Sequence, residues 1–184
     1  MSDIISCLEQ DPVIAAVGDD KWQGALECPV KVIFYMSADV MTIRDRIEQA
    51  HQAGKYVMVH LDMASGIGKD RAGVRFLKTC GADGVISTKG QLIRAAKELG
   101  MFAVQRFFAV DSAGVEGLGD MFRTTGPDLM EIMPGVVTKV IARYAKGGIP
   151  VIAGGLIQTK SEVTDALSAG ATAVSTGQPE LWYI

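Results

Sequence analysis

The chain has 184 residues, of which 48% are hydrophobic and 21% are charged, and its formal net charge is −3 at pH 7. This composition is typical of a globular protein with a buried core and excludes a disordered chain. The net negative charge argues against a generally basic surface that coats nucleic acid. A local basic patch remains possible.

Cys7, Cys28 and Cys80 are the cysteines of the chain, and their spacing matches neither a metal site nor a disulfide framework. We therefore expect a reduced protein in the cytoplasm. The first residues do not form a basic segment followed by an apolar one, so no signal peptide is predicted. Because the longest apolar runs have only strand length, we expect no membrane span.

Residues 1–11 predict a short helix, because Ile4, Ile5 and Leu8 would share one of its faces. Such a helix would either plug the bottom of a barrel or pack on its side. From residue 12 onward, continuous apolar runs of strand length alternate with helical segments, as parallel strands covered on both faces require. The eight predicted strands cover residues 12–17, 30–36, 56–62, 84–88, 101–108, 129–133, 150–155 and 171–177.

The segments between these runs have apolar residues at helical spacing. Asp39 is placed to cap the helix that follows the second strand. Thr159 and Glu162 have the spacing of a capping box before the last helix. Three glycines weaken the helix expected after the fifth strand. The predicted helices lie near residues 22–26, 40–50, 73–80, 92–99, 115–122, 137–144 and 159–167.

Eight strand and helix units favour closure into a small α/β barrel of the (β/α)8 TIM type, and an open doubly wound sheet is the alternative. Such a barrel typically needs about 250 residues, so the loops here must be minimal. No linker or shift in composition divides the chain. We predict one domain over residues 1–184, with a helix at 1–11, the barrel at 12–177 and a short C-terminal piece at 178–184.

The carboxyl ends of parallel barrel strands meet at one face, where the loops after strands seven and eight commonly hold a phosphate. The seventh strand ends in Gly154-Gly155 and the eighth in Ser175-Thr176-Gly177. These small residues would leave backbone N–H groups unshielded, and close packing of the glycine pair is the alternative. The candidate ligand-binding residues at this face are Asp62, Lys89, Gln105, Arg106, Glu131, Gly154, Gly155, Ser175 and Thr176.

Several of these side chains have a structural alternative. Asp62 and Lys89 could simply form an ion pair with each other. Arg106 and Glu131 end adjacent strands and could pair at the mouth of the barrel. Gln105 is expected to point into the barrel rather than outward, but the register of its strand decides this.

His60 has no second histidine at ligand spacing, which favours a hydrogen-bonded core histidine over a metal ligand. Cys80 falls on the apolar face of its helix and is expected to be inert. The sequence contains no GxGxxG fingerprint, Walker loop, HExxH or GxSxG motif. We therefore expect no cofactor and no metal.

Six segments of the chain, taken together, resemble the glycerol-uptake operon antiterminator family. The resemblance extends from about Pro12 to Trp182, and its more specific motifs are Ile-Ser-Thr-Lys, Gln-Arg-Phe-Phe and Glu-Ile-x-Pro-Gly in that order. The segments are His60-Leu-Asp62, Gly81–Lys89, Gln105–Phe108 with Asp111-Ser112, Glu131–Gly135, Ile149–Leu156 and Ala173–Thr176.

The resemblance implies a small β/α barrel that binds glycerol 3-phosphate and acts on the leader mRNA of glycerol-uptake genes to prevent termination. It implies that the phosphate is held by Gly154, Gly155, Ser175 and Thr176. It further implies that the glycerol part or the anion is surrounded by Asp62, Lys89, Gln105, Arg106 and Glu131.

The residues leave other classes of function open. An isomerase or lyase acting on a small phosphorylated substrate would use Asp62 or Glu131 as acid or base and Lys89 as an electrostatic or Schiff-base group. A metabolite sensor with a protein partner is a third class. For the RNA role, a homodimer could join two modest basic patches. The candidate RNA-backbone contacts are Arg44, Arg46, Lys69, Arg71, Arg75, Lys78, Arg94, Lys97, Lys139, Arg143 and Lys146.

Overall fold

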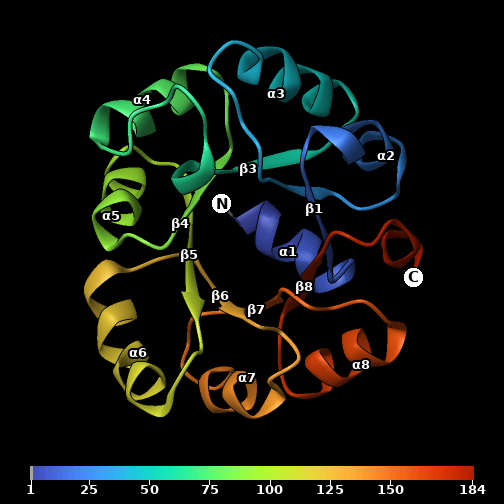
Figure 1. Cartoon of the computed structure of the whole chain (residues 1–184), viewed down its shortest axis with the longest axis vertical. Helices are drawn as coiled ribbons and strands as arrows, with labels where there is room; N and C mark the ends of the chain where they lie inside the picture. The colour runs from blue at the N-terminus through green and yellow to red at the C-terminus, as the bar shows by residue number, and fades with distance from the viewer. Residues whose placement is uncertain (1) are drawn as a thin grey trace.

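The protein is a closed barrel of eight parallel strands, in which each strand pairs with the next along the chain and the last pairs with the first. This computed structural model describes residues 2–184. Helices surround the barrel on its outside (Figure 1). The predicted (β/α)8 fold is confirmed, and the open doubly wound sheet is excluded because β8 closes onto β1.

The elements alternate along the chain as the apolar pattern indicates. The strands are β1 (Val13–Val17), β2 (Val32–Tyr35), β3 (Tyr56–His60), β4 (Gly84–Ser87), β5 (Phe102–Phe108), β6 (Leu129–Met133), β7 (Val151–Gly154) and β8 (Ala173–Thr176). The α-helices are α1 (Ser2–Gln10), α2 (Trp22–Glu27), α3 (Ile43–Gln52), α4 (Arg71–Thr79), α5 (Gly90–Glu98), α6 (Ser112–Thr125), α7 (Thr138–Tyr144) and α8 (Lys160–Ser168). Short 3-10 turns are η1 (Asp19–Lys21), η2 (Leu61–Met63) and η3 (Pro179–Tyr183).

Alternate residues of each strand face the barrel interior and the surrounding helices, because side chains on a strand repeat every two residues. The interior cluster includes Ile14, Phe34, Met58, Phe102, Val104, Leu129, Ile152 and Ala173. The outward cluster under the helices includes Ala15, Ile33, Val57, Ala103 and Val85. Both sets are buried, which explains why the strands are apolar without interruption.

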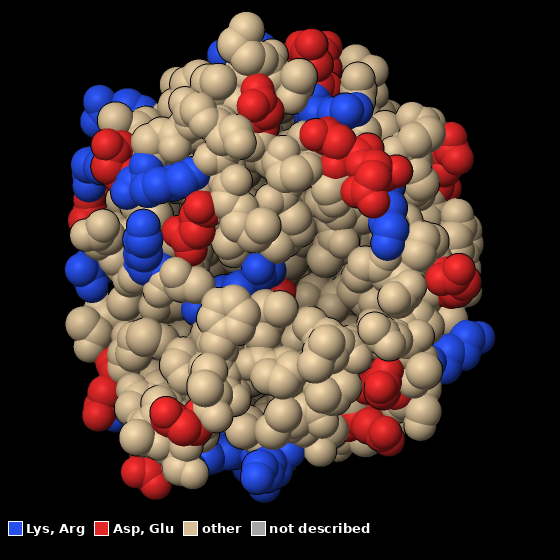
Figure 2. All heavy atoms as spheres, in the orientation of Figure 1, with Lys and Arg blue, Asp and Glu red and all other residues tan. Residues whose placement is uncertain are grey.

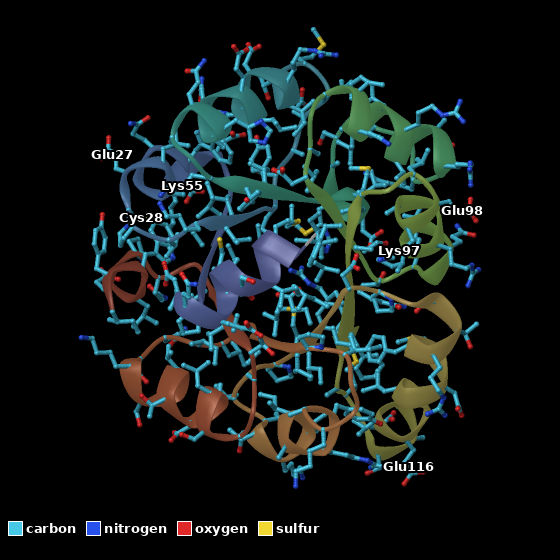
Figure 3. The ribbon with its side chains drawn as sticks, turned by 180° about the vertical axis from the view of Figure 1, so that it is seen from behind. Glu27, Cys28, Lys55, Lys97, Glu98 and Glu116 are labelled. Atoms are coloured by element: carbon cyan, nitrogen blue, oxygen red, sulfur yellow. The ribbon has the colours of Figure 1, made fainter. Side chains whose placement is uncertain are left out.

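Helix α1 plugs the amino-terminal end of the barrel. Its residues Ile4 and Leu8 are buried in the interior cluster, and the chain then enters β1 directly. Figure 3 shows α1 lying across this end of the barrel. Of the two expected positions for the helix, the plug is therefore confirmed; Met1, which the predicted helix included, lies outside the described residues. The opposite end, where the strands terminate, is not covered by this helix.

Most boundaries differ from the expected ones by one or two residues, and two of these differences bear on the expected residue roles. Helix α3 begins at Ile43 rather than after Asp39, because Asp39 accepts a hydrogen bond from the Met41 N–H at 2.9 Å and forms a bridge with Ser65. Strand β3 ends at His60, and the chain turns into η2. Asp62 therefore lies on a turn at the barrel mouth rather than on the strand.

Helix α6 forms in spite of its glycines. Asp111 caps it by accepting a hydrogen bond from the Gly114 N–H at 2.8 Å. Val115, Leu118 and Phe122 are buried against the barrel, so packing overrides the low helix propensity of glycine. Over residues 2–184, none of the helices has the length and apolar character needed to cross a bilayer.

Candidate functional site

A buried polar network lies inside the barrel near the carboxyl ends of β5, β6 and β8. Glu131 has no exposed surface, and its two carboxylate oxygens accept hydrogen bonds from Arg106 Nε and Ser175 Oγ, both at 2.6 Å. The predicted Arg106–Glu131 ion pair is thus confirmed. Figure 2, a view of this face, has a hollow near its centre in which basic and acidic atoms lie side by side.

Each glycine of the pair at the end of β7 is required for a different physical reason. A Cβ atom on Gly154 would collide with the Glu131 carboxylate and the Ser175 hydroxyl, so this glycine makes room for the buried network. Gly155 has φ +73°, a left-handed conformation that favours glycine, and a Cβ there would collide with Met133. Close packing therefore explains why residue 154 is glycine, and the left-handed turn of the loop explains why residue 155 is glycine.

The loops after β7 and β8 present backbone N–H groups that the fold does not use. Within residues 2–184, no carbonyl or side chain accepts a hydrogen bond from the N–H of Gly155, Leu156 or Gly177. The loop is held from its other side, because the Gly135 N–H donates to the carbonyls of Gly154 and Gly155. Such free N–H groups are what an anion requires.

Leu156 adds evidence that this loop has a special conformation. Its φ is +60°, which makes it the one non-glycine residue with positive φ among those described, and its side chain is 64% exposed. A leucine in this conformation carries a steric cost, and such strained positions concentrate at functional sites.

A small cavity of about 130 Å³ lies beside these N–H groups. Arg106 and Glu131 lie at one side of it and the loops after β7 and β8 at the other. Arg106 Nη2 also contacts Met36 Sδ at 3.7 Å, so the guanidinium reaches across the mouth from β5 toward β2. The cavity is lined by Ala16, Met36, Arg106, Glu131, Met133, Gly155, Leu156, Ile157, Ser175, Thr176 and Gly177.

Lys21 is a cation at this end that the sequence analysis missed. It lies at the end of η1, just after β1, and its Nζ donates a hydrogen bond to the Gly177 carbonyl at 2.6 Å. The signal was its position directly after the first strand, which neighbours the eighth strand once a barrel closes.

The two hydroxyl residues of β8 have mainly structural partners. Ser175 faces the interior and binds Glu131, whereas Thr176 donates its hydroxyl hydrogen to the Ile157 carbonyl at 2.8 Å. Thr176 Oγ1 also accepts from the Gln178 N–H at 3.2 Å. Thr176 therefore fastens the loop after β7 to the loop after β8.

Gln105 corrects a prediction. It has the same strand parity as Ala103 and points outward, where its side-chain oxygen accepts a hydrogen bond from Thr125 of α6. The expectation that Gln105 points into the barrel is wrong, because the register of β5 directs Arg106 inward instead.

A second group of polar side chains lies at the ends of β3 and β4. Asp62 accepts hydrogen bonds from Ser87 Oγ at 2.8 Å, from the Thr88 N–H at 2.7 Å and from Thr88 Oγ1 at 2.9 Å. Burial alone would raise the pKa of Asp62, but these hydrogen bonds outweigh it and hold the pKa below its ordinary value. Asp62 is thus a fixed anion.

The Asp62–Lys89 ion pair, which the sequence left open as a structural alternative, does not form in the described chain. Lys89 is exposed at the start of α5. Lys69 lies nearby and donates to the Ala64 carbonyl. Burial lowers the pKa of Lys69, the Asp62 carboxylate opposes this shift, and the charge of Lys89 adds to it. Lys69, assigned to an RNA surface from the sequence, therefore lies at the barrel mouth.

His60, the last residue of β3, is buried at 4% exposure. Neither of its ring nitrogens has a hydrogen-bond partner among the described residues, so the expected core histidine is buried but not hydrogen-bonded. Burial and the charge of Arg106 lower its pKa to about 4, against the opposing effect of Asp62 and Glu131. In residues 2–184, no group of three or more His, Cys, Asp or Glu side chains is placed to hold a metal ion.

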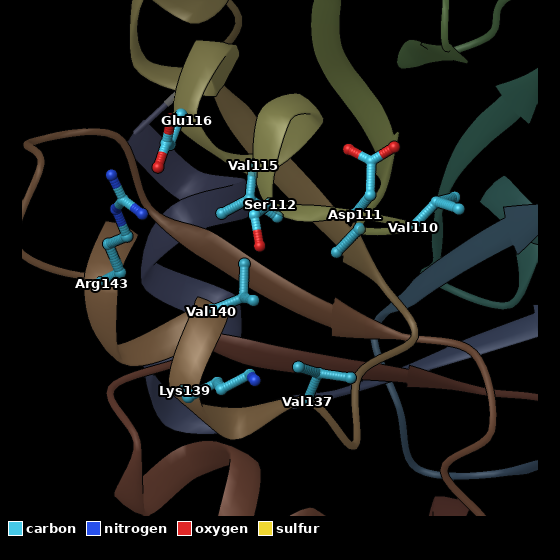
Figure 4. Close-up of a pocket in the computed structure, with 10 residues that line it drawn as sticks. Val110, Asp111, Ser112, Val115, Glu116, Val137, Lys139, Val140 and Arg143 are labelled. Carbon is cyan, nitrogen blue, oxygen red and sulfur yellow. The ribbon is translucent and has the colours of Figure 1, made fainter.

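A wider groove of about 460 Å³ lies away from the barrel axis, between α6 and α7 (Figure 4). Asp111 and Glu116 line its α6 side, and Lys139 and Arg143 line its α7 side. The sequence analysis assigned Lys139 and Arg143 to RNA contacts. Acidic groups face them across the groove, so this region is not a uniformly basic surface.

Residues 13–182 match the model of the family described as glycerol-3-phosphate responsive antiterminator. A protein of Escherichia coli K12 with the description "Uncharacterized protein YgcP" is 34% identical over 184 residues, covering 98% of this chain and 96% of that protein.

Two crystal structures share both fold and sequence with this chain. The glycerol uptake operon antiterminator regulatory protein of Listeria monocytogenes has a TM-score of 0.87 at 32% identity, covering 92% of this chain and 94% of that one. A glycerol uptake operon antiterminator-related protein of Thermotoga maritima has a TM-score of 0.84 at 35% identity, covering 94% and 98%. Several aldolases share the barrel at much lower identity, a likeness that concerns the fold alone.

Proposed function

This chain belongs to the glycerol-3-phosphate responsive antiterminator family, a regulatory family rather than one of enzymes, and from that premise we propose what it binds and where. Glycerol 3-phosphate binds at the carboxyl end of the barrel. The protein in turn binds the leader mRNA of glycerol-uptake genes, and the bound metabolite changes its affinity for that RNA.

The observation that carries the ligand proposal is the pair of loops after β7 and β8. The unused N–H groups of Gly155, Leu156 and Gly177 take the phosphate oxygens. The buried Arg106 lines the cavity, and Lys21, held at the carbonyl of the lining residue Gly177, adds positive charge beside it. A cavity of about 130 Å³ suits a small metabolite rather than a larger ligand.

The amino terminus of α8 is not the phosphate site in this proposal. The Glu162 carboxylate accepts hydrogen bonds from the N–H groups of Gln158 and Thr159, at 2.7 and 2.9 Å. The confirmed capping box with Thr159 therefore already places a negative charge at that end of the helix.

The remaining predicted residues have supporting roles. Gly154 and Ser175 shape and complete the Glu131 network, and Thr176 holds the two loops together. Asp62 and Lys89 lie across the mouth, on the β3–β4 side, where Asp62 faces the uncharged part of the ligand. Gln105, which points outward, is left out of the site.

Calorimetric titration with glycerol 3-phosphate tests the ligand proposal. The K21M variant should bind it about tenfold or more weakly, because a hydrogen bond to a charged group contributes roughly 1.5–3 kcal/mol. K31M is the matched control, since Lys31 is exposed just before β2, at the plugged end of the barrel. No binding by the wild type, or equal binding by K21M, would contradict the proposal.

The RNA proposal is tested by a gel-shift titration of leader RNA with and without glycerol 3-phosphate. Acidic residues are interspersed with the basic ones, as across the groove between α6 and α7, so we expect few phosphate contacts and an affinity that falls with salt less steeply than for basic RNA-binding proteins. Equal RNA affinity with and without the metabolite, at low and moderate salt, would refute ligand control. Light scattering in the same buffer tests whether a homodimer joins two such surfaces.

A further inference from the structure

The end of β3 holds a histidine whose side chain has no role in the fold's own hydrogen bonding. His60 lies two residues after Met58, which belongs to the interior cluster, so both side chains face into the barrel. The residue is 4% exposed. It therefore lies inside the barrel, as the network of Arg106, Glu131 and Ser175 does, and the charges of Arg106 and Glu131 act on it.

Both imidazole nitrogens are buried without a partner in the described part of the chain. Buried polar groups in folded proteins are nearly always hydrogen-bonded, and leaving one unpaired costs free energy. The neighbours do not relieve this, because Glu131 is shared by Arg106 and Ser175, and Asp62 is held by Ser87 and Thr88. The imidazole thus has hydrogen-bonding capacity that a ligand can use.

The charges around His60 define what kind of group it can bind. Arg106 disfavours a second positive charge beside it, and burial keeps the imidazole neutral. A neutral imidazole has one donor nitrogen and one acceptor nitrogen. Hydroxyl groups both donate and accept, whereas a phosphate or carboxylate needs donors only.

We propose that His60 binds the hydroxyl groups of a small polyol phosphate whose phosphate lies at the loops after β7 and β8. This rests on the proposed function and adds the side chain that recognises the uncharged end of the ligand. Arg106 links the two regions, since it lines the cavity and its charge acts on His60. His60 does not itself line the cavity, and in this proposal the flexible side chain of Met36, which lines the cavity, moves to let the carbon chain of the ligand reach the imidazole.

Calorimetric titrations with glycerol 3-phosphate and with inorganic phosphate separate the two ends of the ligand. We expect H60L to lose about tenfold or more in affinity for glycerol 3-phosphate and to bind inorganic phosphate as the wild type does. H60Q, which keeps a donor and an acceptor, should retain most of the affinity. H51L is the matched control, because His51 is the other histidine of the chain and pairs with Asp83 on the outside.

A second measurement does not depend on a variant that folds. The chain has two histidines, so the imidazole nitrogen resonances of His60 can be assigned in the wild-type protein by comparison with H51Q. They should move on addition of glycerol 3-phosphate and stay in place with inorganic phosphate.

The outcomes distinguish this inference from the proposed function. If the wild type binds neither probe, the proposed function itself fails and this inference falls with it. Two results would overturn this inference alone when the wild type binds both probes. The first is an H60L variant that binds glycerol 3-phosphate and inorganic phosphate with the wild-type affinities. The second is a set of His60 resonances that do not move on addition of glycerol 3-phosphate. His60 would then be a structural histidine satisfied by internal water.

Discussion

Glu131 carries a carboxylate into a part of the barrel with no exposure to solvent, and Arg106 is the cation that compensates it. Removing one member of a buried pair leaves the other uncompensated, which costs about 3–5 kcal/mol. We therefore expect E131L to lower the free energy of unfolding by about that amount. The R106L/E131L double variant should lose less, because no buried charge is left over.

Urea unfolding of E131L, R106L and the double variant measures this difference. E98Q is the control, since the Arg71–Glu98 pair is solvent-exposed and such pairs contribute about 0–1 kcal/mol. If the double variant were as unstable as E131L plus R106L added together, the pair would not be the source of the loss.

The pKa of His60 makes the stability of the protein depend on pH. Its folded pKa is about 4, below the ordinary 6.5, because of burial and the charge of Arg106. Between these values the unfolded chain binds the proton that the folded protein excludes. Stability is therefore full above about pH 6.5 and falls as the pH is lowered toward 4, by about 3 kcal/mol in total.

Urea unfolding at a series of pH values between 4.5 and 7 tests this linkage, and H60Q should flatten the curve while H51Q should not. The pKa of Asp62 is also lowered, so this carboxylate adds its own loss of stability at lower pH, and the comparison of variants rather than the wild-type slope carries the test. A curve for H60Q as steep as that of the wild type would assign the loss to other groups.

At the scale of elements, two glycines should respond in opposite directions to the same substitution. Gly117 lies exposed inside α6 with nothing near its added Cβ, so G117A should stabilise the protein by about 0.5–1 kcal/mol. G155A introduces a side chain at φ +73° against Met133, and should destabilise the protein by about 1 kcal/mol or more.

Thermal unfolding of both variants shows whether each substitution raises or lowers stability. Titration with glycerol 3-phosphate then measures the affinity of each variant for the ligand. G155A should weaken binding because the loop N–H groups shift, whereas G117A should leave binding unchanged. A neutral effect of G155A on both stability and binding would mean that the left-handed turn after β7 is not needed.

The order and type of the elements could be predicted because each strand is a continuous apolar run set between helical segments. Strand β6 was predicted with its observed bounds. Asp39 was misassigned as a helix cap because an Asp side chain satisfies a turn N–H equally well. The orientation of Gln105 could not be predicted, since a shift of one residue in register reverses every side chain of a strand.

The same limits apply to the candidate site. Closure of a barrel brings strand ends together, so the convergence of Arg106, Glu131 and Ser175 could be predicted from their positions. The role of Lys21 depends on the contact between the loop after β1 and the end of β8, which follows from closure of the barrel and not from the residues next to Lys21 in the sequence. The unpartnered nitrogens of His60 depend on what every neighbouring side chain already binds.

At the scale of the whole molecule, one end of the barrel is closed and the other is open. Helix α1 fills the amino-terminal end with Ile4 and Leu8, so a ligand can enter only from the carboxyl face. The chain is short for this fold, and its loops on that face are correspondingly brief. Under the proposed function, any effect of the metabolite on RNA affinity must therefore start from these few loops.

Linkage between the two ligands is reciprocal, and this gives the last prediction. If glycerol 3-phosphate changes RNA affinity through a coupling of about 1–3 kcal/mol, or about 5–150-fold, leader RNA must change metabolite affinity by the same factor. Gel shifts with saturating metabolite give the first factor, and calorimetry with saturating RNA gives the second. K21M should weaken metabolite binding while leaving the RNA affinity of the metabolite-free protein unchanged, because Lys21 is engaged at the Gly177 carbonyl. If the metabolite leaves RNA affinity unchanged and RNA leaves metabolite affinity unchanged, the barrel binds its two ligands independently. If K21M without metabolite binds RNA more weakly than the wild type, RNA contacts the same loops.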